Sequence, residues 1–272
     1  MKKKSFTVGD IYDLLVSMVD KADVNPSEDI ITFGPKTSHV NKIVVCWMSD
    51  VSALDFAAKE GANLMIVHES PFFPYNVNSV GGAPDHMAWQ ANHNRIVKMA
   101  KNGIHIIRMH MPVDNYCILN EFAAMLGLDK PAVVLRPNMK PLDISVFDIE
   151  SCSFQALIDR VKASMNIPSL RVSNGDLNRI VNRIGIAWGG LGLFVNVAMV
   201  QDLIDLGSEA IIVGETDNYG IRFAIDAGVD VIEAGHEVSE NPGLKRFAKD
   251  LALMLPELPV VFYENETPFL FR

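Results

Sequence analysis

Short apolar runs alternate with stretches of helical periodicity along almost the whole chain. Runs rich in Val and Ile predict strands, and apolar residues that recur every three or four positions predict helices. The predicted strands are residues 42–47, 63–67, 104–109, 132–135, 144–147, 170–172, 183–188, 210–213, 229–233 and 260–263. The predicted helices are residues 10–22, 51–59, 93–101, 116–126, 154–165, 195–206, 221–227 and 244–253. This alternation predicts an α/β fold with mostly parallel sheets that helices cover on both faces.

Three of these strands occur twice, in the same order along the chain. Gly61 and Gly207 precede the second strand of each set, and Gly103 and Gly228 precede the third, where each glycine would end a helix. The matching segments are residues 42–47 and 183–188, residues 61–69 and 207–215, and residues 103–108 and 228–233. The repeat predicts two related α/β halves around an irregular stretch at residues 127–180. We expect one domain from residues 1–128 with 241–272, and a second from residues 129–240.

Composition and charge narrow the classes of function. The chain has 272 residues, 49% of them hydrophobic, and a net charge of −9. The acidity argues against general binding of nucleic acid or anionic membranes, because both need clustered Lys and Arg. Charges break the apolar runs before they reach transmembrane length, and the basic N-terminus lacks the apolar stretch of a signal peptide. The cysteines are far apart, which argues against disulfides and a thiolate zinc site, so we expect a cytoplasmic protein.

Polar side chains follow the repeated strands, at the sheet edge where open α/β folds bind their ligands. His68 and Glu69 come directly after the second strand of the first half, and His110 and Asp114 come after its third strand. An Asp before a helix is more often an N-cap than a ligand. The recurrence of such residues in both halves is therefore the stronger signal.

His236 and Glu240 follow the third strand of the second half and are four residues apart. If a helix begins there, both side chains project from one face and reach one ion or two adjacent ions. Imidazole with carboxylate suits Zn, Fe, Mn, Co or Ni, although a lone pair of this spacing is more often a solvated surface pair. In the repeat, Asp114 falls one position from the match of Glu240, which favours a metal site between the halves.

These motifs resemble those of the NIF3 family, also called DUF34 or the GTP cyclohydrolase type 2 homologue family, whose members are dinuclear metal proteins. The apolar strand that ends in His68-Glu69-Ser70-Pro71 is similar to the family's strand ending in His-His-Pro. Residues 110–114 resemble the family's His-Thr-Asn-Leu-Asp motif, residues 234–240 its Ala-Gly-His-x-x-x-Glu motif, and residues 214–215 its Gly-Glu turn. The similarity in order and spacing covers most of residues 40–240.

The resemblance implies two divalent metal ions and a specific set of ligands. It assigns ligand roles to His68, Asp114, His236 and Glu240, and places Glu69 where the family has a second His. Glu69 then either binds metal through oxygen or turns away, which weakens or removes one metal position. A His that usually follows the Gly-Glu turn is absent here. The resemblance also implies a ring-like homohexamer, and this short chain has no room for the ferredoxin-like domain inserted in longer members.

Two functions remain open from the sequence. In a metal-dependent hydrolase, two ions hold a bridging water and polarise the bond of a nucleotide-like, phosphoester or cyclic amide substrate. The candidate general acids or bases are His110, which is preferred, Glu215, and Glu69 if it is not a ligand. Alternatively, His110 is a structural residue that orients a metal ligand. The alternative function is a non-catalytic metal-binding or regulatory protein. A dinucleotide-binding loop at residues 185–192 is disfavoured because its spacing is not GxGxxG.

Overall fold

The computed structural model describes residues 5–75, 84–137 and 142–269, which form two compact units. Unit 1 consists of Met1–Cys117 and Leu244–Asn265, and unit 2 of Ile118–Gly243 and Glu266–Arg272. The division therefore falls inside one helix, α9 (His236–Met254), whose first residues belong to unit 2 and whose remainder belongs to unit 1.

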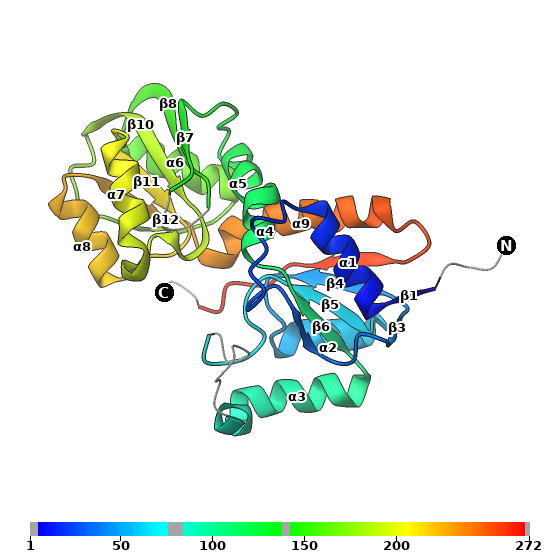
Figure 1. Cartoon of the computed structure of the whole chain (residues 1–272). Coiled ribbons are helices and arrows are strands. Elements are labelled where there is room, and N and C mark those ends of the chain that lie inside the picture. The colour runs from blue at the N-terminus through cyan, green and yellow to red at the C-terminus, as the bar shows by residue number, and fades with distance from the viewer. Residues whose placement is uncertain (1–4, 76–83, 138–141, 270–272) are drawn as a thin grey trace. The chain divides into compact units, whose positions relative to one another are not determined.

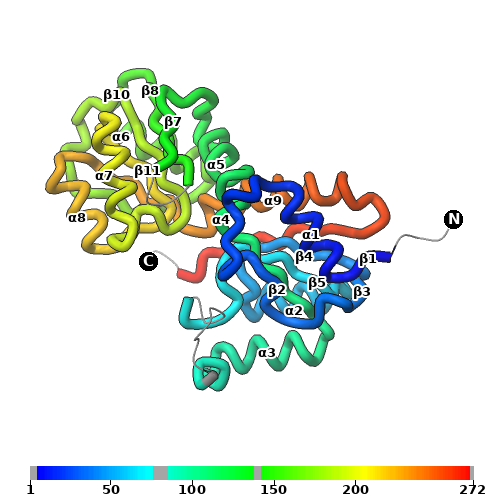
Figure 2. Tube along the Cα trace, in the orientation of Figure 1, coloured from blue at the N-terminus to red at the C-terminus, as the bar shows by residue number. Residues whose placement is uncertain are grey.

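Unit 1 is built on a mostly parallel sheet of strand order β13-β4-β5-β6-β2. Its strands are β4 (Ile43–Cys46), β5 (Leu64–Val67), β6 (His105–Arg108) and β13 (Val260–Tyr263), with β2 (Ile31–Phe33) antiparallel to β6. A small antiparallel pair, β1 (Phe6–Thr7) and β3 (His39–Val40), lies apart from it. The tube in Figure 2 shows β13, the last strand of the chain, beside β4.

Helices cover both faces of this sheet, as the continuous burial of β4 and β5 requires. They are α1 (Val8–Met18), α2 (Val51–Lys59), α3 (Gln90–Asn102) and the short α4 (Met111–Val113), with a 3-10 turn η1 (Pro84–Ala88) before α3. Figure 1 shows α1 on the opposite side of the sheet from α3. Side chains such as Val44, Met65 and Ile106 pack with Leu54 of α2 and Met99 of α3 in one hydrophobic core.

Unit 2 contains a sheet of strand order β7-β8-β10-β11-β12-β9. Its parallel centre is β10 (Ile180–Ala187), β11 (Ala210–Val213) and β12 (Asp230–Glu233), and the antiparallel strands are β7 (Val133–Leu135), β8 (Ile144–Ser153) and β9 (Arg171–Val172). The helices are α5 (Leu119–Met125), α6 (Phe154–Met165), α7 (Val197–Asp205) and α8 (Asn218–Asp226), with 3-10 turns η3 (Gly189–Leu191) and η4 (Phe194–Asn196). Helix α7 packs against α8 and against β8 and β10.

The strand registers confirm the two related halves that the sequence repeat predicts. In unit 1, Ile43 pairs with Leu64, and Leu64 pairs with His105. The aligned residues pair in the same way in unit 2, where they are Ile184, Ala210 and Asp230. Each half also adds a short antiparallel strand beside its third parallel strand, β2 in one and β9 in the other. Hydrogen bonding thus reproduces the sequence alignment residue by residue.

Some elements differ from the predicted ones for local reasons. Strand β8 continues to Ser153, beyond the predicted residue 147, because its polar end pairs with β10 and Asp148 forms an ion pair of 2.6 Å with Arg183. The predicted helix at residues 116–126 corresponds to the end of a π-helical turn η2 (Asp114–Ile118) and to α5, and the helical path begins earlier, at α4. Among the helices of the described residues, none combines the length and apolar character needed to cross a membrane.

Candidate metal centre

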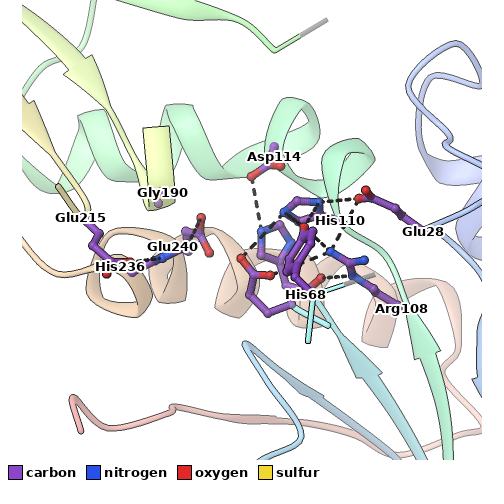
Figure 3. Close-up of polar contacts among 12 residues, drawn as sticks. Glu28, His68, Arg108, His110, Asp114, Gly190, Glu215, His236 and Glu240 are labelled. Atoms are coloured by element: carbon purple, nitrogen blue, oxygen red, sulfur yellow. Dashed lines mark hydrogen bonds and ion pairs between the residues drawn. The ribbon is translucent and has the colours of Figure 1, made fainter. Parts of the chain in front are cut away.

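Unit 1 brings together an imidazole and a carboxylate from two neighbouring strand ends. His68 follows β5 and Asp114 follows β6 after α4, and both residues are buried. The Nε2 atom of His68 lies 3.4 Å from Oδ1 of Asp114, a contact drawn in Figure 3. Nδ1 of His68 lies 3.3 Å from the carbonyl oxygen of Met109, which can only accept, so Nδ1 carries the proton. His68 therefore presents an Nε2 lone pair beside Asp114.

Asp114 has the backbone of a helical residue rather than that of an N-cap. It ends α4 and begins η2 with φ −52° and ψ −55°, so one helical path leads from Met111 into α5. A π-helical turn is rare and is frequently found at functional sites. The capping role that an isolated Asp would suggest does not apply here.

Glu69 and His110 lie beside this pair in unit 1. Oε1 of Glu69 is 3.8 Å from Nε2 of His110, and the ring of His110 lies 4.7 Å from the ring of His68. His68, Glu69 and His110 each offer a ligand atom, and these three atoms lie within 4.8 Å of one another. All four residues that the sequence predicts for this half are thus neighbours.

Two acidic residues that the sequence did not indicate bind the ring and the backbone N–H of His110. Oε2 of Glu28 lies 3.0 Å from Nδ1 of His110, and the backbone N–H of His110 donates to Oδ1 of Asp29 at 2.6 Å. The hydrogen bond with His110 lowers the pKa of Glu28 below its ordinary value, although burial opposes it. Burial raises the pKa of Asp29, although backbone N–H groups donate to its carboxylate. Both acids precede β2 in a loop without periodicity, so the sequence carries no pattern that marks them.

Arg108 is the other unexpected member of this group. It is the last residue of β6 and is 3% exposed. Its Nη2 lies 3.6 Å from Glu28 and 3.9 Å from Glu69, and it also donates to the Tyr75 hydroxyl. A charged residue that ends an apolar strand is a signal that could have drawn attention to Arg108, because a buried guanidinium needs partners.

Unit 2 contains a similar pair on the first turn of α9. Nε2 of His236 lies 3.4 Å from Oε1 of Glu240, one helical turn further on. Nδ1 of His236 lies 2.9 Å from Oε2 of Glu215, as Figure 3 shows. Glu240 is buried and the side chain of Glu215 is half-exposed. The Glu215 carboxylate accepts from Nδ1, and Nε2 is left with the lone pair on the side of Glu240.

Glycines make room for this second pair. Gly189 has φ +51°, and a Cβ there would lie 1.9 Å from Oε1 of Glu240 and 3.2 Å from Nε2 of His236. A Cβ at Gly190 would lie 3.3 Å from the His236 ring. The backbone N–H of Gly189 donates to the hydroxyl of Ser239 at 2.8 Å. The glycine-rich segment after β10 therefore packs against His236 and Glu240.

Both pairs fit the geometry of metal ligands. Two donors of one tetrahedral ion, each about 2.1 Å from it, lie about 3.4 Å apart. The Nε2-to-oxygen distance is 3.4 Å in unit 1 and 3.4 Å in unit 2. In each unit, an acceptor on the far side of the ring fixes the tautomer that leaves Nε2 available. The residues of each unit thus suit a divalent cation.

Comparison with known proteins identifies distant relatives that match over most of the chain. A family model described as Duf34/NIF3 (NGG1p interacting factor 3) matches residues 8–268. A Clostridium acetobutylicum protein named GTP cyclohydrolase 1 type 2 homolog is 22% identical over 281 residues, which cover 96% of this chain and 98% of the relative.

Solved structures share the fold at lower identity. The hypothetical protein SA1388 of Staphylococcus aureus has a TM-score of 0.76 at 16% identity, covering 99% of this chain and 100% of that chain. A Bacillus cereus protein related to NIF3 also has a TM-score of 0.76, at 15% identity and with the same coverage of both chains.

Proposed function

Because the chain belongs to the Duf34/NIF3 family, we propose that it is a divalent-metal protein that acts as a hydrolase on a small substrate. The observation that carries the proposal is that each unit holds a pair of side chains of the ligand type. Each unit offers one Nε2 and one carboxylate oxygen 3.4 Å apart, at the carboxyl end of its parallel strands. Chance gives one such pair in many proteins, but two with the same spacing, with Asp114 one position from the repeat match of Glu240, call for a shared cause.

We propose further that the metal ligands are His68, Asp114, His236 and Glu240. The first two lie in unit 1, and the last two lie at the start of α9, in its unit 2 part. The number of ions depends on Glu69.

The hydrolase proposal assigns distinct tasks to the remaining residues. A divalent ion in this centre would lower the pKa of a bound water and polarise the bond under attack. Glu28 holds Nδ1 of His110, so the other ring nitrogen of His110 is the one that exchanges a proton with substrate. Glu215, the other candidate acid or base, touches Nδ1 of His236 and thereby keeps that ring in place. The proposed substrate is nucleotide-like, a phosphoester or a cyclic amide, in keeping with the name of the Clostridium relative.

One observation favours the non-catalytic alternative. Glu69 stands where the family motif has a second His, and it lies close to a buried arginine, Arg108. A protein whose ligand set has diverged in this way would bind metal without turning over a substrate, as an ion carrier or a regulator does.

Two measurements test these proposals together. Elemental analysis of protein purified without chelator gives the metal content, with Asp114→Asn and His236→Ala expected to lower it. Turnover is then measured against nucleotides, phosphodiesters and cyclic amides, with and without added Mn²⁺. Bound metal without turnover above the His236→Ala variant would leave the non-catalytic function. Absence of bound metal in the unaltered protein would contradict both.

A further inference from the structure

Arg108 brings a fixed positive charge into the ligand cluster of unit 1. Its Nη2 lies between two carboxylates, 3.6 Å from Oε2 of Glu28 and 3.9 Å from Oε2 of Glu69. Its Nε donates to the carbonyl oxygen of His68 at 3.2 Å, and its guanidinium lies over the ring of Tyr75. These contacts hold the guanidinium from several sides, so its position is determined by the fold.

The charge of Arg108 does not depend on pH or on any bound ion. A guanidinium stays protonated throughout the physiological range, and a buried carboxylate is stabilised by an opposite charge or by hydrogen-bond donors. Glu69 is 6% exposed, so it needs such partners whether or not a metal is bound. Within unit 1, Arg108 and His110 lie 3.9 Å and 3.8 Å from its carboxylate, and Arg108 is the one whose positive charge is permanent.

A second metal ion at Glu69 would be repelled by the positive charge of Arg108. A cation bound to the Glu69 carboxylate would lie within a few ångströms of the guanidinium, at the short range where like charges in a buried place repel strongly. The pair formed by His68 and Asp114 is in a different situation. Arg108 contacts the backbone carbonyl of His68 and leaves the Nε2 of that ring directed at Asp114.

We propose that Arg108 takes the place of one of the two metal ions that the family motifs imply, so that the chain binds a single divalent cation and none at Glu69. Glu69 is then the partner of a built-in cation and not a ligand. This inference rests on the proposed metal-binding function. It makes Arg108 the residue that sets the number of ions per chain.

The central test replaces Arg108 with an apolar side chain of similar length. We expect the unaltered protein to bind one Mn²⁺ or Zn²⁺ per chain by calorimetric titration and elemental analysis, and Arg108→Met to bind two. Arg108→Lys keeps the charge and stays at one. Adding Glu69→Gln to Arg108→Met removes the freed carboxylate, and the number returns to one.

Arg95 supplies a matched control. It is also a buried arginine of unit 1, but it donates to the carbonyl of Pro71 and lies over the ring of Phe73. Arg95→Met should leave one ion per chain, whatever it does to stability. If Arg108→Met fails to fold by circular dichroism, Glu69→Gln in the unaltered background still decides the question. It should keep one ion with affinity changed less than about threefold, because Glu69 is not a ligand.

Three results would overturn the inference. They are two ions in the unaltered protein, loss of an ion on Glu69→Gln alone, and a folded Arg108→Met variant that still binds one ion. If no variant and not even the unaltered protein binds metal, the proposed function itself fails and the inference fails with it.

Discussion

At the scale of single residues, the orientation of one imidazole ring depends on a neighbour that has no direct role as a ligand. Glu215 accepts from Nδ1 of His236 and so fixes both the tautomer and the rotation of the ring. Glu215→Gln should lower metal affinity by about 10- to 100-fold while the number of ions at saturation stays the same. Calorimetric titration measures both quantities. Glu264→Gln, at an exposed acid of unit 1, is the control, and equal affinities in the two variants would show that the contact is incidental.

A second prediction concerns Gly189, where the backbone strain of an alanine can be separated from the clash of its Cβ with Glu240. Gly189 and Gly228 both have positive φ, +51° and +77°, but a Cβ at Gly228 would meet nothing within 4 Å. Alanine in this backbone region costs about 1–2 kcal/mol of the free energy of unfolding, and both variants should lose at least that in urea denaturation. Only Gly189→Ala should also lose metal affinity, because its Cβ displaces Oε1 of Glu240. Equal affinity in both variants would count against Glu240 as a ligand.

At the scale of secondary structure elements, the start of α8 depends on one side chain. Asp217 accepts hydrogen bonds from the backbone N–H groups of Tyr219 and Gly220, and also from Phe194. Burial raises the pKa of Asp217, but the hydrogen bonds from these N–H groups outweigh burial. The net result is a pKa below the ordinary value of 3.8. Because the folded pKa lies below the unfolded one, the stabilisation is complete above pH 3.8 and is lost as the pH falls through the folded pKa.

Asp217→Ala should therefore reduce the free energy of unfolding by about 1 kcal/mol at neutral pH and by less at pH 3. Urea denaturation at the two pH values measures this difference. Asp226→Ala is the control on the same helix, because Asp226 is its last residue, where a negative charge gains nothing from the helix dipole. A loss for Asp217→Ala that is as large at pH 3 as at pH 7 would mean that packing, and not the charged cap, is responsible.

The elements that could be predicted from the sequence are those whose burial leaves a simple period. Residues Ile43–Cys46 and Ala210–Val213 are buried on both sides, so each reads as an unbroken apolar run between helices. The polar end of β8 and the turn η2 have no such apolar period in the sequence. The end of β8 is held by pairing with β10. The turn η2 differs from an α-helix only in its backbone hydrogen bonding, which the pattern of side chains does not show.

At the scale of the whole molecule, the same distinction separates the predicted part of the candidate site from the rest. His68, Asp114, His236 and Glu240 could be named from the sequence because they follow strands of a repeat whose register the structure confirms. The partners of Arg108 could not. Glu28 and Tyr75 come from loops, and their approach to β6 depends on how unit 1 folds around its sheet. Strand ends are visible in a sequence, whereas the loops that close over them are not.

Bound metal would also change how the chain unfolds. An ion that binds the folded form alone stabilises it by RT ln(1 + [L]/Kd), which is about 2.7 kcal/mol at a concentration of 100 times Kd. Since the proposed ligands include residues of unit 1 and residues of unit 2, bound metal should stabilise both units. Differential scanning calorimetry should show a higher unfolding temperature with Mn²⁺ than after chelation. His236→Ala, which removes a ligand of unit 2, should resemble the chelated protein even with Mn²⁺ present. If Mn²⁺ raises the unfolding temperature of His236→Ala as much as that of the unaltered protein, His236 is not a ligand and the assignment in unit 2 is wrong.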